Sequence, residues 1–390
     1  MEIAARLAIG TIAMLVCVSA AVPSQILENW QIQMQHSSVA QIAGEHAPGS
    51  DPQAEDELRK GTDLTRQGQF GDAIPHLLAA QDRAANQYAA KFNLALCYVG
   101  TNQFRQALEV LTSLRATGHD NADVNNLLAQ AYIGDSQNEK ALDALQRAGN
   151  LTPANEKLYT FVADACMGKQ EYALGLQVVA LGLKDLRDSA RLHYERGMFL
   201  SLSDQFDLGK NEFDLVTTLA PDTDIAFVAS VQKAMFEGNI SQAIRVARAG
   251  ISKGHQDFML LTLLGEALLR AGAAPGQPDF GEARAALEKS VEERPNYAGS
   301  QLTLGKLYLL ENRADAAISH LEIARQLSAN NPAVYSQLAG AYRKQGDLQK
   351  AQDALATLGK LNEAQAARIR SAPGDHKAGY GRAVVSPQHP

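Results

Sequence analysis

The hydrophobic and polar positions between Gly305 and Leu327 follow a pattern typical of two short helices joined by a tight turn. A tyrosine follows Gly305 after three residues, a polar turn comes next, and Ala317 lies twelve residues after the glycine. Leu321 and Ala324 then continue at the spacing of one helix face. A single pair of such helices cannot bury both of its apolar faces, so the pattern predicts that similar pairs stack on either side.

The small residues of this pattern recur along the chain at a step of 34 residues, with one longer step of 40. The first series is Gly61, Ala95, Ala129, Ala163, Gly197, Val231, Gly265, Gly305 and Ala339. The second series, in the following helix, is Ala73, Ala107, Ala141, Gly175, Gly209, Ala243, Ala283, Ala317 and Ala351. The period predicts nine units, each with a first helix (A) and a second helix (B). We number these units one to nine, and they span about residues 54–87, 88–121, 122–155, 156–189, 190–223, 224–257, 258–297, 298–331 and 332–365.

Aromatic residues and prolines recur in register with the small residues. Three residues after the first small residue stand Tyr98, Tyr132, Tyr308 and Tyr342, and three before the second stand Phe70, Phe104, Tyr172, Phe206 and Phe280. The B helices are closed by Pro153, Pro221 and Pro295. Over about residues 54–365 the chain resembles the tetratricopeptide repeat. The resemblance implies an all-α fold, a right-handed α-solenoid superhelix of about nine helix-turn-helix repeats with a capping C-terminal helix.

Units four to six fit the pattern least well. Gly175 and Gly209 replace alanine at the second small position, and Gly182 and Gly250 lie further along their B helices. Glycine lowers helix stability by roughly 0.5–1 kcal/mol relative to alanine. The middle of the array is therefore either softer than its ends, or built from backbones that approach more closely.

Unit seven carries extra residues at 271–279, in the predicted turn between its helices. Such turns project away from the stack and tolerate insertions. The insertion is read either as a longer loop without a role or as a loop that contacts a partner.

The two ends of the chain have different compositions from the repeats. Residues 1–21 read as a signal peptide, with an apolar run too short for an ordinary membrane span. The alternatives are an uncleaved anchor, in which case the chain would contact a membrane, and lipidation. Residues 22–53 form a leader segment that is read either as mobile or as carrying a short amphipathic helix at 24–34, and 366–390 reads as a disordered tail. We therefore expect an exported protein, periplasmic or secreted, of bacterial source.

The charge of the chain excludes some classes of partner. The net charge of −7 is modest and no block of like charges stands out, so nucleic acid and anionic membrane surfaces are poor partners.

Cys97 and Cys166 fall on A helices two units apart, at a separation of about 20 Å given helix spacings of roughly 8–10 Å. Because a disulfide needs Cα atoms within about 7 Å, we expect two buried free thiols.

The sequence carries no recognisable catalytic signature. There is no Gly-x-Ser-x-Gly, no phosphate-binding glycine loop, no Cys-x-x-Cys and no His-Glu-x-x-His, and the nine histidines are scattered. We therefore expect no enzymatic activity, no metal and no small-molecule cofactor.

The remaining candidate site is the inner, concave wall that the A helices of a tetratricopeptide superhelix build. The resemblance assigns to this wall the A-helix positions that stay out of the core, among them polar residues such as Asp164, Arg191, Glu195 and Glu266. The residues predicted to form a peptide groove are Phe92, Asn93, Leu96, Asn126, Leu127, Gln130, Phe161, Met167, Tyr194, Met198, Met235, Phe236, Leu263 and Leu309. Aromatic, methionine and leucine side chains predominate, which is typical of a surface for varied protein partners. The competing interpretation is that tight superhelical curvature buries these side chains between neighbouring A helices.

The sequence thus leads to two functional hypotheses. The first is a non-catalytic scaffold that binds a protein or peptide segment in its concave apolar groove. The alternative is a structural component of a cell-envelope assembly that uses its convex or end surfaces.

Overall fold

The computed structural model describes residues 51–371, and every regular element in this part of the chain is an α-helix. The predicted signal peptide, the leader helix at 24–34 and the tail beyond residue 371 lie outside the described residues. The helices are α3 (Pro52–Arg66), α4 (Phe70–Ala80), α5 (Gln87–Gly100), α6 (Phe104–Ala116), α7 (Ala122–Gly134), α8 (Asn138–Leu151), α9 (Glu156–Lys169), α10 (Tyr172–Asp185), α11 (Ala190–Leu202), α12 (Phe206–Leu219), α13 (Asp224–Phe236), α14 (Ile240–Ser252), α15 (Phe258–Arg270), α16 (Pro278–Glu293), α17 (Ala298–Leu310), α18 (Ala314–Leu327), α19 (Pro332–Gln345) and α20 (Leu348–Ser371).

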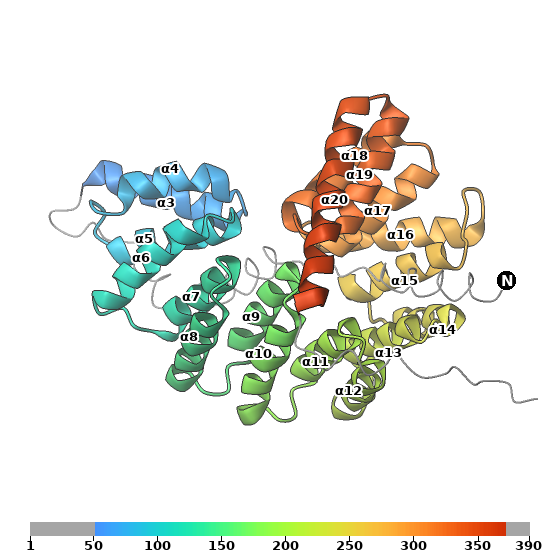
Figure 1. Cartoon of the computed structure of the whole chain (residues 1–390), viewed down its shortest axis with the longest axis horizontal. Helices are drawn as coiled ribbons and strands as arrows, with labels where there is room; N and C mark the ends of the chain where they lie inside the picture. The colour runs from blue at the N-terminus through green and yellow to red at the C-terminus, as the bar shows by residue number, and fades with distance from the viewer. Residues whose placement is uncertain (1–50, 372–390) are drawn as a thin grey trace, which may run out of the picture.

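These helices form nine consecutive pairs, with the odd-numbered helix as A and the even-numbered helix as B in each unit. Figure 1 shows the pairs following one another around a curved array, with α7, α9 and α11 inside α8, α10 and α12. Each helix packs on its chain neighbours, and successive A helices also pack on one another. The predicted all-α solenoid superhelix is confirmed.

The small residues mark the places where the A and B helices of a unit cross. A Cβ atom added to Gly61 would lie 2.6 Å from the Leu77 side chain. The same contact recurs between Gly305 and Leu321, also at 2.6 Å. Because real Cβ atoms do not approach this closely, a leucine of helix B occupies the space that a side chain on helix A would need. The period seen in the sequence is therefore the period of this crossing.

A left-handed residue is present in each of the nine turns between an A helix and its B helix. These residues are Gly68, Asn102, Ser136, Gln170, Asp204, Gly238, Gly272, Asn312 and Gly346. In most of these turns the amide that follows returns to a carbonyl of the last helical turn, as from Gln103 N to Tyr98 O at 2.7 Å. This arrangement satisfies carbonyl groups that would otherwise lack a partner at the helix end, and it turns the chain back sharply.

The glycines of the middle units allow closer helix approach. A Cβ atom on Gly175 would lie 2.3 Å from the buried ring of Phe199. On Gly209 it would lie 2.8 Å from the backbone oxygen of Gly197. Of the two interpretations left open by the sequence, the structure therefore supports close packing in units four to six.

The insertion in unit seven forms the turn at 271–277, between the end of α15 and the start of α16. Gly272 and Gly276 adopt left-handed conformations there, and Gln277 Oε1 accepts a hydrogen bond of 3.0 Å from Ala274 N. The last helix, α20, runs without interruption to Ser371, past residue 366 where the sequence suggested that the tail begins. The final unit and the expected capping helix are thus one continuous element.

The described cysteines are free and buried, as expected. Burial raises the pKa of the Cys97 thiol to about 11, and the same effect raises the pKa of the Cys166 thiol. Both side chains therefore stay protonated and act as small apolar groups. Among the helices of residues 51–371, none combines the length and apolar character needed to cross a bilayer.

Candidate functional site

The predicted groove residues all lie on A helices. Phe92, Asn93 and Leu96 belong to α5, and Asn126, Leu127 and Gln130 belong to α7. The others are Phe161 and Met167 on α9, Tyr194 and Met198 on α11, Met235 and Phe236 on α13, Leu263 on α15, and Leu309 on α17. The structure thus distributes them over seven successive inner helices, as the repeat register requires.

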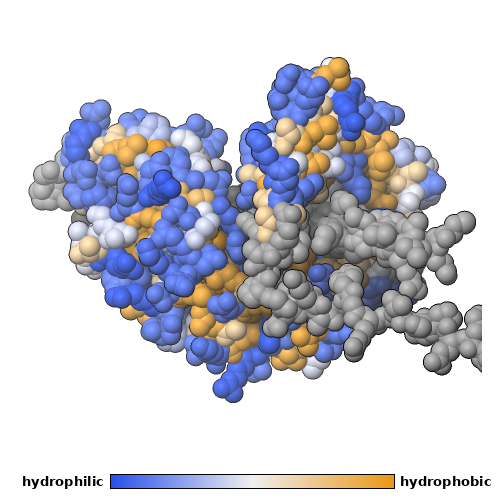
Figure 2. All heavy atoms as spheres, viewed as in Figure 1, coloured by the Kyte–Doolittle hydropathy of each residue, from blue (hydrophilic) through white to orange (hydrophobic). Residues whose placement is uncertain are grey.

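The structure buries the predicted groove residues, with Phe236 as the exception. Phe236 is half-buried and points to the B helix of the preceding unit, where its ring stacks on Phe213 at 6.1 Å between centroids. Most of the buried members belong to the continuous core, because successive A helices pack directly on one another. These side chains therefore do not form an open apolar wall, and their role in binding stays a prediction. Figure 2 shows that hydrophilic residues cover most of the described surface in that view.

Polar side chains on the inner helices form a directed chain of hydrogen bonds. Asn126 Nδ2 donates to Leu158 O at 2.6 Å, and Gln130 Nε2 donates to Asn126 Oδ1 at 2.8 Å. The Oε1 atom of Gln130 is buried and has no hydrogen-bond partner among residues 51–371, and the same is true of Asn93 Oδ1 on the neighbouring helix. A buried polar atom without a partner costs free energy of folding. Each of these two oxygens could therefore accept a hydrogen bond from a bound molecule.

A charged cluster follows on α9 and α11, and a separate ion pair lies on α15. Arg191 Nη2 lies 2.6 Å from Glu195 Oε1, and the Glu195 side chain is only 5% exposed. Burial raises the pKa of the Glu195 carboxyl, although the nearby Arg191 guanidinium acts in the opposite direction. The pKa of Asp164 is also raised, first by burial and then by the Glu195 carboxylate. On α15, the Glu266 carboxylate lies 3.8 Å from the guanidinium of Arg270.

These amides and ion pairs suit the binding of peptide groups and charged side chains of another polypeptide. Ion pairs and amides held on the inner helices can exchange their partners for the peptide groups and charges of another chain. Within residues 51–371 there is no group of three or more His, Cys, Asp or Glu side chains placed to hold a metal ion.

The repeat pattern of the sequence did not predict the contact between units four and eight. Gln170 Nε2, after α9, donates to Asn330 O in the turn between α18 and α19 at 3.4 Å. These residues are 160 positions apart, whereas the repeat pattern relates only residues one unit apart. No signal in the sequence marks this contact, because it depends on the pitch of the whole superhelix.

Comparison with known proteins agrees with this architecture. Two family models, each described as tetratricopeptide repeat, match residues 64–131 and 309–372, and residues 276–332. Anaphase-promoting complex subunit 7 from Homo sapiens is 26% identical over 166 residues, which is 42% of this chain and 29% of that protein. The Mus musculus subunit matches with the same values. The chain therefore spans less than a third of the length of these curated relatives.

Three solved structures of low identity also match parts of this chain. A tetratricopeptide repeat protein from Parabacteroides merdae is 18% identical, with a TM-score of 0.40 over 75% of this chain and 99% of the other. The Cut9–Hcn1 hetero-tetramer of the anaphase-promoting complex is 16% identical, with a TM-score of 0.45 over 78% and 64%. A Thermus thermophilus tetratricopeptide repeat protein is 21% identical, with a TM-score of 0.40 over 47% and 96%. Together with the helix pairs described above, the family models show that this chain contains tetratricopeptide repeats.

Proposed function

We propose that the chain is a non-catalytic scaffold that binds a protein segment along the inner face of its superhelix. The observation that carries the proposal is the unused hydrogen-bonding capacity of Asn93 and Gln130, both of which are almost fully buried on adjacent A helices. A surface that served only for stacking would be more stable with apolar side chains at these positions. Peptide N–H groups of a partner would supply the missing donors.

The neighbouring charged cluster and the relatives support the same function. The Arg191–Glu195 ion pair offers charged contacts to polar side chains of a bound segment, and the Asp164 carboxyl offers a hydrogen-bonding group. The relatives from human and mouse are, by name, subunits of a complex, and the part that resembles them is a repeat array. This supports a partner that is a protein.

Site-specific photo-crosslinking tests the proposal. A benzoyl-phenylalanine placed at Lys306 or at Asp164 reports on the inner face, because both positions directly follow a first small residue of the repeat. Matched reporters at Leu208 and Leu215, which are 53% and 36% exposed on the B helix α12, sample the outer face. We expect protein adducts from the inner positions after irradiation in the native host. Adducts from the outer positions alone would reject inner-face binding.

A second candidate function, a structural component of a cell-envelope assembly, is favoured by apolar exposure at the end of the array. On α20, Leu348 is 63% and Leu355 43% exposed. Such residues would let the last unit pack on another protein. Adding reporters at Leu348 and Leu355 to the crosslinking set separates the two functions, because adducts confined to the α12 and α20 positions would favour assembly through outer and end surfaces.

We also propose that the protein is exported, on the basis of the sequence of residues 1–21. Fusion of alkaline phosphatase after residue 53 should give periplasmic enzyme activity that depends on those residues. Equal activity after their deletion would contradict export.

A further inference from the structure

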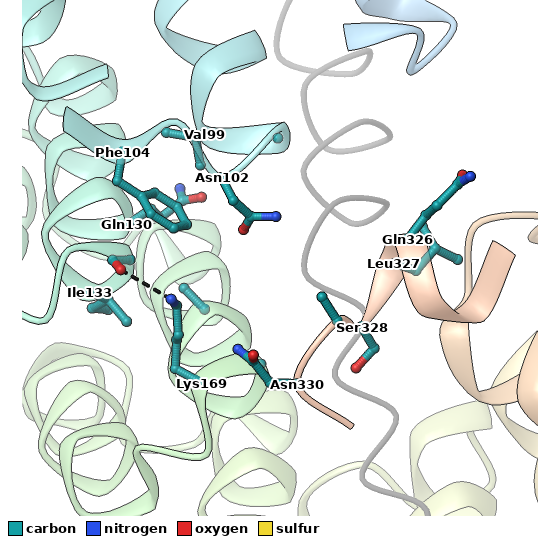
Figure 3. Close-up of a pocket in the computed structure, with 15 residues that line it drawn as sticks. Val99, Asn102, Phe104, Gln130, Ile133, Lys169, Gln326, Leu327, Ser328 and Asn330 are labelled. Carbon is teal, nitrogen blue, oxygen red and sulfur yellow. Dashed lines mark hydrogen bonds between the residues drawn. The ribbon is translucent and has the colours of Figure 1, made fainter. Parts of the chain in front are cut away.

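A cavity lies where the superhelix meets itself. The turn between α18 and α19 faces the C-terminal ends of α5, α7 and α9, and the Gln170–Asn330 hydrogen bond joins the two sides. The volume of this partly open space is about 70 Å³. Figure 3 shows Val99, Gln130 and Ile133 on one side and Leu327 and Ser328 on the other, with Asn330 reaching across towards Lys169. We call this space the seam cavity.

The hydrogen bonds around Gln130 determine which of its side-chain atoms lacks a hydrogen-bond partner. Leu158 O can only accept, so Asn126 must donate through Nδ2 and present Oδ1 to Gln130. Gln130 then donates through Nε2, which leaves its Oε1 as the end of the chain. The side chain is 2% exposed and lines the seam cavity. The cavity therefore contains a buried acceptor that lacks a donor.

The cavity has a lysine and apolar side chains among its other lining groups. Lys169 also lines it, with its Nζ 3.0 Å from Gly134 O and 4.8 Å from the centroid of the Phe104 ring. The apolar lining from Val99 and Ile133 favours a hydrocarbon group next to the N–H that donates to Gln130.

We propose that the seam cavity binds one short branched aliphatic residue of a partner segment, whose backbone N–H donates to Gln130 Oε1. This inference rests on the proposed function and identifies an anchor for the bound segment. The space is several times the roughly 10–15 Å³ that one water requires, and it suits a side chain of a few carbon atoms. Occupation by water alone is the competing outcome of the test.

The test uses two small amides and the full-length protein. N-isopropylacetamide has the branched group and the N–H, whereas N-isopropyl-N-methylacetamide lacks the N–H. Binding is followed by the methyl resonance of isotope-labelled Ile133, which is 1% exposed and lines the seam cavity. We expect a saturable shift with the secondary amide and about tenfold weaker binding of the tertiary amide, because the buried acceptor then stays unpaired.

Two variants complete the design. Gln130→Met keeps the length of the side chain but removes the acceptor, so it should bind both amides equally. Gln232→Met, at the equivalent position of unit six, should keep the wild-type preference. Equal binding of both amides by the wild-type protein, or no saturable shift at Ile133, overturns the proposal even if Gln130→Met fails to fold. The crosslinks from Lys306 would persist in that case, which distinguishes loss of the anchor from loss of the proposed function.

Discussion

Gly175 and Gly209 show how a missing methyl group sets the distance between helices. Alanine is the better helix former, yet the space beside Gly175 is filled by Phe199, one of the largest fully buried side chains. Beside Gly209 the obstacles are the Ser201 hydroxyl and the backbone oxygen of Gly197, and the latter cannot rotate away. The helix propensity lost at these positions is offset by contact between α10 and α11 and within unit five.

We predict that Gly175→Ala destabilises the protein by about 1–3 kcal/mol, because the added methyl group would force Phe199 or its helix to move. The matched control is Gly281→Ala on α16, where a Cβ atom would have no neighbour within 4 Å. The control should stabilise by about 0.5–1 kcal/mol. Urea midpoints measured by circular dichroism check both changes, and a stabilising Gly175→Ala would contradict the close packing.

Tyr342 gives a prediction about alkaline pH. Its hydroxyl donates to Glu322 Oε1 at 2.6 Å, and burial together with this carboxylate raises its pKa to about 12. Between the ordinary tyrosine pKa near 10 and this value, the unfolded chain loses the proton while the folded chain keeps it. The contribution to stability is therefore complete below pH 10 and is lost as the pH rises towards 12.

Tyr342→Phe should lower the urea midpoint at pH 8, because it leaves the Glu322 carboxylate without this donor. It should also reduce the fall in stability between pH 8 and pH 11. Tyr132→Phe is a suitable control, since the residue twenty positions before Tyr132 is Thr112 and not a carboxylate. An unchanged alkaline fall in Tyr342→Phe would assign that fall to other groups.

At the scale of the element, the turns between units have their own conformational requirements. Ala154, in the exposed turn between α8 and α9, has φ +59 although it is not glycine. This left-handed conformation costs an alanine roughly 1–2 kcal/mol. We predict that Ala154→Gly raises stability by about 0.5–1 kcal/mol, after the greater entropy of glycine in the unfolded chain is subtracted.

The control for Ala154→Gly is the same substitution at Ala356, which is exposed within α20. There the change should destabilise, because glycine is a poor helix former. The two urea midpoints should therefore move in opposite directions. A shift of the same sign in both variants would show that the conformation of Ala154 does not limit stability.

Side-chain bonds of fixed spacing also join the two helices of several units. His76 contacts Glu57, His193 contacts Glu212 and His320 contacts Gln301, each across 19 residues and at 2.6–2.7 Å.

The helix pairs and their order were predictable, because small residues must recur wherever two helices cross. The histidine contacts were not predicted, since scattered histidines reveal a partner only once the crossing geometry is known.

The candidate site was less predictable than the fold, for a physical reason. The repeat register places Phe161 and Met198 on A helices correctly, but it does not encode how tightly the superhelix curves. Curvature decides whether such side chains face solvent or a neighbouring helix, and here they are buried. The unpaired oxygen of Gln130 could not be foreseen either, because it depends on hydrogen bonds to two other residues.

At the scale of the whole molecule, the superhelix is held by two very different kinds of contact. Neighbouring units share a continuous apolar core, whereas units four and eight meet through the single hydrogen bond from Gln170 to Asn330 among those described. Because each unit of a solenoid is stabilised mainly by its neighbours, this seam should open without unfolding any helix. Opening would also give a partner access to the inner face.

We predict that the distance across the seam fluctuates more than distances along the array. Spin labels at introduced cysteines can measure this by pulsed electron resonance, because the buried, protonated Cys97 and Cys166 should not react. The test pair is Arg105 with Gln326, on opposite sides of the seam. The control pair is Arg105 with Ala173, two units apart along the stack at about 20 Å. The control should give a narrow distribution and the seam pair a broad one, and equally narrow distributions would show that the seam is a rigid interface.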